Sequence, residues 1–269
     1  MTSVNELLAP GAVALGARAG DWREAITLGG RLLEGSGAIT SAYTDAMIAS
    51  VEDNGPYIVV APGFAFAHAR PSEAVKRTAI SWVRLAEPVE FGHGSHDPVD
   101  LVVALAAKDS REHTAAMKQL AGIIGDPDKR AALDRVGTEE ELRAVLEPEE
   151  RAPKAASEYK AAGATRATSA DSVESKGKIL TVCGNGLGTS LFLKNTLDKV
   201  LDAWGWDPYV SVEATDTISA KGRAKEADFI MTSGEIARTL GDVGVPVRVI
   251  ENFTSMGEID SALRELYDV

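Results

Sequence analysis

The stretch KILTVCGNGLGTSLFLKNTLDKVLDAW, residues 178–204, decides the fold of the second half of this chain. Its opening, KILTVC, is apolar and β-branched, which is typical of a buried strand, and 189–204 has apolar residues at helical spacing. The loop between them holds the only cysteine, Cys183, and three glycines. A strand that turns through a glycine-rich loop into a helix is the opening unit of a parallel α/β sheet.

The same alternation continues to the end of the chain. Further strands are predicted at 209–214, 227–233 and 245–251, and further helices at 219–226, 234–240 and 255–266. Repeated strand–helix order with helical crossovers predicts a doubly wound sheet of four parallel strands over residues 177–269.

The first half of the chain has a different order of elements. Amphipathic spacing predicts helices at 21–37, 41–55, 111–124, 129–136 and 138–146, and short β-branched runs predict strands at 57–61, 78–86 and 99–107. We therefore expect a mixed α/β domain, a sheet flanked by helices, over residues 1–147.

The segment between the two domains, residues 148–176, has another composition. It is dense in Ala, Ser, Thr and charged residues and has almost no large apolar side chains to bury. These features predict a flexible linker. Because Ala, Glu and Lys favour helix, a helical extension over its first half is the alternative.

Composition limits the partners of this chain. Its 269 residues carry 28 Lys and Arg against 40 Asp and Glu, a formal charge of −12, so we expect no nucleic-acid binding. The longest apolar run, at 101–107, is far short of the roughly 20 residues of a membrane span, and the start lacks signal-peptide features. We expect a cytoplasmic protein without membrane insertion. A homo-oligomer is compatible with these features.

The loop after the first parallel strand is predicted to bind an anion. Ligands gather at the carboxyl ends of strands in such sheets, and glycines free the backbone N–H groups to turn inward, beside the positive end of the helix. The predicted cradle consists of Gly184, Asn185, Gly186, Leu187, Gly188, Thr189 and Ser190. We expect the Cys183 thiol to ionise more easily here than at the usual pKa of about 8.5, and to act as a nucleophile toward a phosphoryl group. A buried structural cysteine is the alternative.

Two kinds of enzyme place a cysteine in such a loop. Tyrosine phosphatases of low molecular mass have an arginine six residues after the cysteine, where this chain has Thr189. Without that guanidinium we expect slow hydrolysis of a thiophosphate, which favours a protein that passes the group onward. The segment CGNGLGTSLFLKN, 183–195, resembles the phosphorylated loop of the enzyme IIB component of the bacterial phosphoenolpyruvate-dependent sugar phosphotransferase system (PTS), most of all the ascorbate type.

A second resemblance lies in the first half. The segment NGPYIVVAPGFAFAHARPSEAV, 54–75, resembles the active-site segment of the mannitol/fructose/ascorbate class of enzyme IIA, and 87–113 is similar to its ascorbate branch. The resemblance implies that His68 accepts phosphate from the phosphocarrier protein HPr and that His113 donates a hydrogen bond to the phosphoryl oxygens. We add Arg70, because a fixed cation near the transferring group lowers the barrier.

Some residues depart from these patterns. Ala67 stands where a proline usually precedes the active histidine, and Glu52 stands where mannitol-type relatives carry an arginine. The positive charge that helps to bind phosphate is therefore expected from elsewhere. His93, His96 and Asp97 have the spacing of metal ligands, but a turn is favoured there. We expect neither a metal nor a cofactor.

Together these features predict a fused IIA–IIB phosphotransferase. Phosphate would pass from HPr to His68, then to Cys183, and then to a sugar at a membrane IIC permease, with ascorbate implied by the resemblance. The alternatives are a regulatory module that uses phosphorylation as a signal and a cysteine-dependent small-molecule phosphatase.

Overall fold

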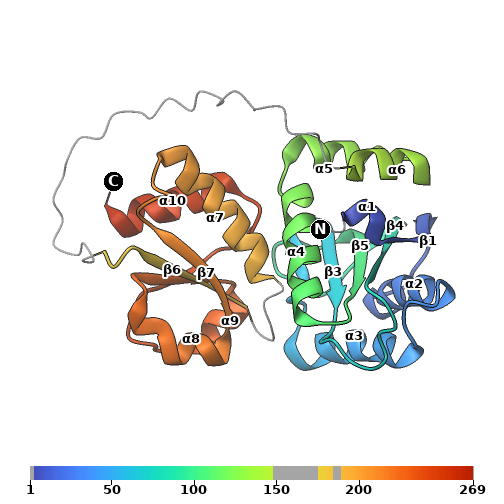
Figure 1. Cartoon of the computed structure of the whole chain (residues 1–269), viewed down its shortest axis with the longest axis horizontal. Helices are drawn as coiled ribbons and strands as arrows, with labels where there is room; N and C mark the ends of the chain where they lie inside the picture. The colour runs from blue at the N-terminus through green and yellow to red at the C-terminus, as the bar shows by residue number, and fades with distance from the viewer. Residues whose placement is uncertain (1–2, 148–174, 184–188, 269) are drawn as a thin grey trace. The chain divides into compact units, whose positions relative to one another are not determined.

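The computed structural model describes residues 3–147, 175–183 and 189–268 (Figure 1). Its contacts divide the chain into two compact units, Met1–Glu147 and Pro148–Val269, and each is described by itself. The predicted linker lies outside the described residues except for Ser175 and Lys176, so its character stays a prediction. No helix in the described segments combines the length and apolar character that a bilayer crossing requires.

The N-terminal unit contains a mixed five-stranded sheet in the order β1-β4-β5-β3-β2. Its strands are β1 (Leu8–Ala17), β2 (Val59–Ala61), β3 (Phe64–His68), β4 (Ala79–Val89) and β5 (Val99–Ala106). β1 is parallel to β4 and β3 is parallel to β5, whereas the other neighbours are antiparallel. The predicted mixed α/β class is confirmed.

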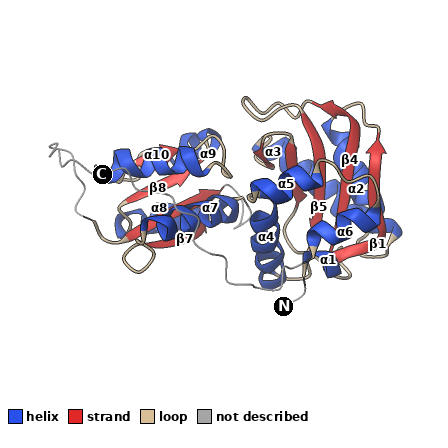
Figure 2. Cartoon of the chain, turned by 90° about the horizontal axis from the view of Figure 1, so that it is seen from above, coloured by secondary structure: helices blue, strands red, loops and turns tan. Residues whose placement is uncertain are grey.

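Helices cover both faces of this sheet (Figure 2). They are α1 (Val4–Leu7), α2 (Trp22–Gly35), α3 (Ser41–Asn54), α4 (Ser110–Ile124), α5 (Pro127–Leu133) and α6 (Glu139–Leu146). α2 and α3 lie on one face, and α4, α5 and α6 lie on the other. Side-chain caps mark where helices begin: Asp21 accepts from the Glu24 N–H before α2, and Asp109 accepts from the Glu112 N–H before α4.

The side chains of β3 divide between the two faces. Ala65 and Ala67 belong to the core under α2 and α3, whereas the ring of His68 lies 5.5 Å from the ring of His113 in α4. This follows from the alternation of side chains along a strand. The last residue of β3 is therefore held on the α4 face of the sheet.

The sequence patterns missed β1 and β3. The sequence patterns predict no strand at 64–68, yet these residues form β3, which pairs with β2 and β5. Its FAFAH sequence includes two alanines, which have low strand propensity, so pairing with β5 decides its conformation. β1 contains a proline and two glycines, Gly11 and Gly16, with positive φ angles, which fits an edge strand with an irregular register.

The C-terminal unit contains four parallel strands in the order β7-β6-β8-β9, as predicted. The strands are β6 (Lys178–Cys183), β7 (Ser211–Asp216), β8 (Phe229–Thr232) and β9 (Val247–Val249). The helices are α7 (Ser190–Trp204), α8 (Thr217–Arg223) with the 3₁₀ turn Ala224–Glu226, α9 (Gly234–Leu240) and α10 (Met256–Tyr267). α7 and α10 cover one face, and α8 and α9 cover the other (Figure 1).

The strand order reverses at β6. β7 pairs on one side of it and β8 on the other, so the carboxyl end of β6 lies at the point where the chain switches direction. Open parallel sheets place their ligand sites at such switch points. Cys183 is the residue that ends β6 there.

Candidate active site

His68 is held as a neutral imidazole at the end of β3. Its Nδ1 lies 2.8 Å from the Phe66 carbonyl oxygen. Because a carbonyl oxygen only accepts, Nδ1 carries the hydrogen and the lone pair is left on Nε2. Burial lowers the pKa of His68, and the bond to Phe66 acts in the opposite direction. The ring therefore presents a nucleophilic nitrogen without prior loss of a proton.

His113 lies beside it, in the first turn of α4. The ring centroids of His68 and His113 are 5.5 Å apart, and Nε2 of His113 is buried with no hydrogen-bond partner among the described residues. A buried polar atom without a partner is costly. Burial, with the charge of His68 second, lowers the pKa of His113 to about 4. In its Nε2–H tautomer, this ring would donate to an anionic oxygen bound at His68.

This lowered pKa predicts an acid-sensitive N-terminal domain. The unfolded chain has a histidine pKa of about 6.5, so between pH 6.5 and 4 it binds more protons than the folded chain, and stability falls as the pH decreases. Between pH 7 and pH 5, His113 should lower the free energy of unfolding by about 2 kcal/mol. Urea unfolding followed by amide NMR signals of this domain should show that loss reduced in His113→Gln. Equal losses in both proteins would contradict the assignment.

Two aromatic rings complete the surroundings of His68. The Tyr57 ring meets it edge-on at 5.7 Å between centroids, and the Phe66 ring lies at 5.4 Å. They restrict the orientation of the imidazole and exclude water from it. Sequence reasoning missed both roles, although both residues lie within the segment that carries the IIA resemblance. Arg70, two residues beyond the strand end, is exposed, and its role stays a prediction.

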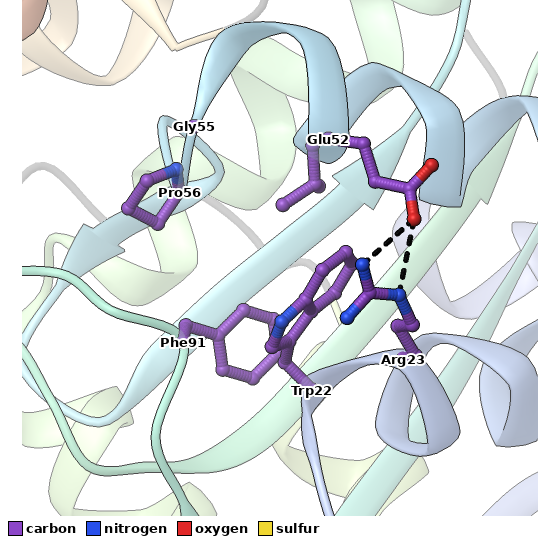
Figure 3. Close-up of a pocket in the computed structure, with 7 residues that line it drawn as sticks. Trp22, Arg23, Glu52, Gly55, Pro56 and Phe91 are labelled. Carbon is purple, nitrogen blue, oxygen red and sulfur yellow. Dashed lines mark hydrogen bonds and ion pairs between the residues drawn. The ribbon is translucent and has the colours of Figure 1, made fainter.

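Glu52 belongs to a different place in the domain. It pairs with Arg23 of α2, whose Nε and Nη2 lie 3.0 and 2.8 Å from Oε1, at the edge of a cavity of about 400 Å³ that Trp22 and Phe91 also line (Figure 3). The guanidinium carbon lies 4.3 Å above the Trp22 ring. Phe91 packs into the core under α2 and α3, on the face opposite to the His68 ring. The two charges compensate each other, so this cavity has no net positive charge to offer a phosphate.

Cys183 is enclosed at the end of β6, with 3% of its surface exposed. Its thiol donates to Ser190 Oγ at 3.3 Å and lies 4.0 Å from the Thr215 carbonyl oxygen. Burial raises the pKa of the Cys183 thiol, and hydrogen bonds with Ser190 and Thr189 oppose this without outweighing it. Among the described residues, the cost of desolvating the thiolate exceeds what these hydrogen bonds return, so they do not account for the expected easier ionisation. The backbone N–H groups of residues 184–188, on which that expectation depends, lie outside the described residues, and it stays a prediction.

The phosphate cradle is described only at its end. Thr189 caps α7 and Ser190 is its first residue, and both are buried. The other predicted members, Gly184, Asn185, Gly186, Leu187 and Gly188, lie outside the described residues. Their contribution to anion binding stays a prediction.

The segment around His93 forms a turn. The Asp97 carboxylate accepts from the backbone N–H groups of Phe91 and His93, and the rings of His93 and His96 stack 4.4 Å apart. Within the described ranges, no group of three or more His, Cys, Asp or Glu side chains could hold a metal ion. Asp97 therefore closes the turn that leads into β5.

Comparison with protein families assigns both halves of the chain. Residues 6–148, more than half of the chain, match the model described as "Phosphoenolpyruvate-dependent sugar phosphotransferase system, EIIA 2". Residues 178–265 match the model described as "PTS system, Lactose/Cellobiose specific IIB subunit". The second description names a sugar type that differs from the ascorbate resemblance of the cysteine loop.

Individual relatives match the first half. The ascorbate-specific PTS system EIIA component of Escherichia coli K12 is 36% identical over 136 residues, covering 50% of this chain and 88% of that protein. The component of the same name from Salmonella typhimurium is 43% identical over 101 residues, covering 38% and 66%. The solution structure of the mannitol-specific cryptic phosphotransferase enzyme IIA CmtB from Escherichia coli is 28% identical with a TM-score of 0.50, covering 54% of this chain and 98% of that one.

The family matches and the geometry agree on the kind of chemistry. A neutral, buried imidazole in the first unit and a single thiol at a strand end in the second are nucleophiles suited to carrying a phosphoryl group. The chain belongs to the phosphoenolpyruvate-dependent sugar phosphotransferase system and consists of an enzyme IIA domain followed by an enzyme IIB domain.

Proposed function

We propose that this chain takes a phosphoryl group from HPr onto His68, passes it to Cys183, and delivers it to a sugar bound by a membrane IIC permease. The observation that carries the proposal is the histidine pair. Nδ1 of His68 is committed to the Phe66 carbonyl, and an unpartnered buried Nε2 of His113 lies beside the ring that must bind an anion.

In the first step, Nε2 of His68 attacks the phosphorus of phosphorylated HPr. A nitrogen–phosphorus bond forms on His68 as the corresponding bond on HPr breaks. No proton has to leave His68, because the attacking nitrogen carries a lone pair and Nδ1 keeps its hydrogen. His113 would stabilise the phosphoryl oxygens by filling its own missing hydrogen bond. Arg70 is proposed as the further cation at this site.

In the second step, the Cys183 sulfur attacks the phosphorus on His68. The thiol proton first passes to solvent, because the thiolate is the nucleophile. A sulfur–phosphorus bond then forms while the bond to Nε2 breaks, and its electron pair returns to Nε2 of His68. Burial raises the pKa of this thiol, so ionisation is a separate cost of this step. Ser190, Thr189 and the residues 184–188 are proposed to hold the phosphoryl oxygens on the cysteine.

We propose ascorbate as the sugar, because two relatives of the IIA domain are ascorbate-specific EIIA components. The chain would act in the cytoplasm, held near the membrane through the permease. The test combines phosphoenolpyruvate, enzyme I, HPr, this chain and vesicles that contain a candidate IIC permease. Ascorbate phosphate should form, whereas mannitol and cellobiose should give none. Phosphorylation of another sugar would refute the specificity. Release of inorganic phosphate without any sugar phosphate would favour a phosphatase.

A further inference from the structure

We propose that Tyr43 is a positioning residue for phosphoryl transfer at His68, because its hydroxyl holds the strand end from which His68 projects. This inference rests on the proposed role of His68 as the phosphate acceptor. Tyr43 lies in the first turn of α3, its side chain is fully buried, and nothing in the sequence patterns assigned it a role.

The Tyr43 hydroxyl contacts the backbone on both sides of the His68 position. It lies 2.9 Å from the Ala69 carbonyl oxygen, 3.2 Å from the Ala69 nitrogen and 3.0 Å from the Leu105 carbonyl oxygen. Ala69 directly follows His68, and Leu105 is the register partner of His68 on β5. One phenol hydroxyl therefore joins the chain just beyond the histidine to the strand beside it.

These backbone groups need such a partner. The ladder between β3 and β5 ends at the His68–Leu105 pair, yet Ala69 is still buried, with 8% of its surface exposed. Buried backbone N–H and C=O groups without partners are costly. A hydroxyl can accept from the Ala69 N–H and donate its single hydrogen to one of the two carbonyl oxygens. Burial raises the pKa of Tyr43 to about 12, so this hydrogen is retained at neutral pH.

The hydrogen bonds of the Tyr43 hydroxyl matter for the reaction because the tautomer of His68 depends on backbone geometry. The Nδ1–H bond goes to the carbonyl of Phe66, two residues earlier, and forms only while residues 66–68 keep the conformation of the strand. If the end of β3 frays, the His68 ring loses this bond, and the orientation of its Nε2 is no longer fixed. Displacements of about 1 Å at a reacting group can cost a hundredfold in rate.

The test compares Tyr43→Phe with Ser81→Ala. Ser81 is also fully buried, and its hydroxyl donates to the Gly29 carbonyl oxygen at 2.8 Å, so the control loses a comparable bond away from His68. Phosphorylation by HPr is measured in rapid-quench experiments on the full chain. We expect Tyr43→Phe to lower kcat about tenfold with an unchanged KM for HPr. In ¹⁵N NMR spectra the His68 ring should become a mixture of tautomers. The kcat of Ser81→Ala should stay within about twofold of the wild type, and its His68 ring should keep a single tautomer.

The outcomes separate this inference from the proposed function. A kcat of Tyr43→Phe within twofold of the wild type, or an equal loss in Ser81→Ala, would overturn the positioning role. If Tyr43→Phe does not fold, hydrogen exchange of the wild-type chain tests the inference instead. The Ala69 amide should be protected, and exchange at the rate of an unprotected amide would overturn the inference. Normal phosphorylation of His68→Ala would instead show that the proposed acceptor is wrong.

Discussion

His68→Ala should reduce labelling of both domains to background when the chain is incubated with ³²P-phosphoenolpyruvate, enzyme I and HPr. The relay has one entry point, the Nε2 lone pair of His68, and alanine removes the atom that forms the first bond. Cys183 then has no donor, so its label disappears although its own domain is unchanged. The label on each domain is measured after proteolytic cleavage between residues 148 and 174.

His93→Ala is the matched control for this substitution. It removes another imidazole of the same domain, one that lies in the turn closed by Asp97. Labelling of both domains should remain at the wild-type level. Label on Cys183 in the absence of His68 would mean that HPr phosphorylates the second domain directly, and the order of the relay would be wrong.

Cys183→Ser should trap the label on His68 and stop formation of the sugar phosphate. Serine nearly matches cysteine in size, so the end of β6 should keep its packing. A hydroxyl, however, is far less acidic than a thiol and is a weak nucleophile without an adjacent base. Acid-labile phosphohistidine should accumulate in the first domain while the second domain stays unlabelled. A labelled second domain would exclude Cys183 as the acceptor.

The same step should depend on pH in the wild type. Because burial raises the pKa of Cys183, most of the thiol is protonated at pH 7, and transfer from His68 should speed up as the pH rises, by up to about tenfold per pH unit below that pKa. The rate of the first step should not change with pH above 6.5, because burial lowers the pKa of His68 below its usual value of about 6.5 and keeps the ring neutral. Single-turnover rates from pH 6.5 to 9 measure both steps. A second step without pH dependence would mean that the thiol is already ionised.

Alkylation gives an independent check on the thiol. Cys183 is the only cysteine of the chain, so the pH dependence of its reaction with iodoacetamide reports a single group. The curve should follow that of the second step. Faster alkylation than for free cysteine at pH 7 would contradict the raised pKa, and it would restore the original expectation that the glycine-rich loop favours the thiolate.

The difference between the two nucleophiles has one physical cause. Burial disfavours the charged form of each group, so it keeps the imidazole of His68 neutral and the thiol of Cys183 protonated. For a histidine the neutral form is the nucleophile, whereas for a cysteine the charged form is. The same desolvation thus favours the first acceptor and holds back the second.

How much could be read in advance differs between the halves. In the C-terminal unit, strand and helix periods alternate cleanly, so the parallel sheet and the place of Cys183 at a strand end were both predicted correctly. In the N-terminal unit the main error was the conformation around His68. Two alanines and two phenylalanines in a run of five residues carry no clear local signal, and the pairing with β5 decided it.

The amino-acid order alone determined the elements whose periodicity is local, the identity of the two nucleophiles, and the family resemblance of the segments around them. Tertiary structure alone decided that His113 stands beside His68, that Tyr43 reaches the end of β3, and that burial raises the pKa of the Cys183 thiol. Periodicity depends on residues that are close in the sequence, whereas burial and hydrogen-bond partners come from residues that are far apart in the chain. The proton affinity of a side chain depends on its burial and its hydrogen-bond partners, so the sequence alone does not determine it.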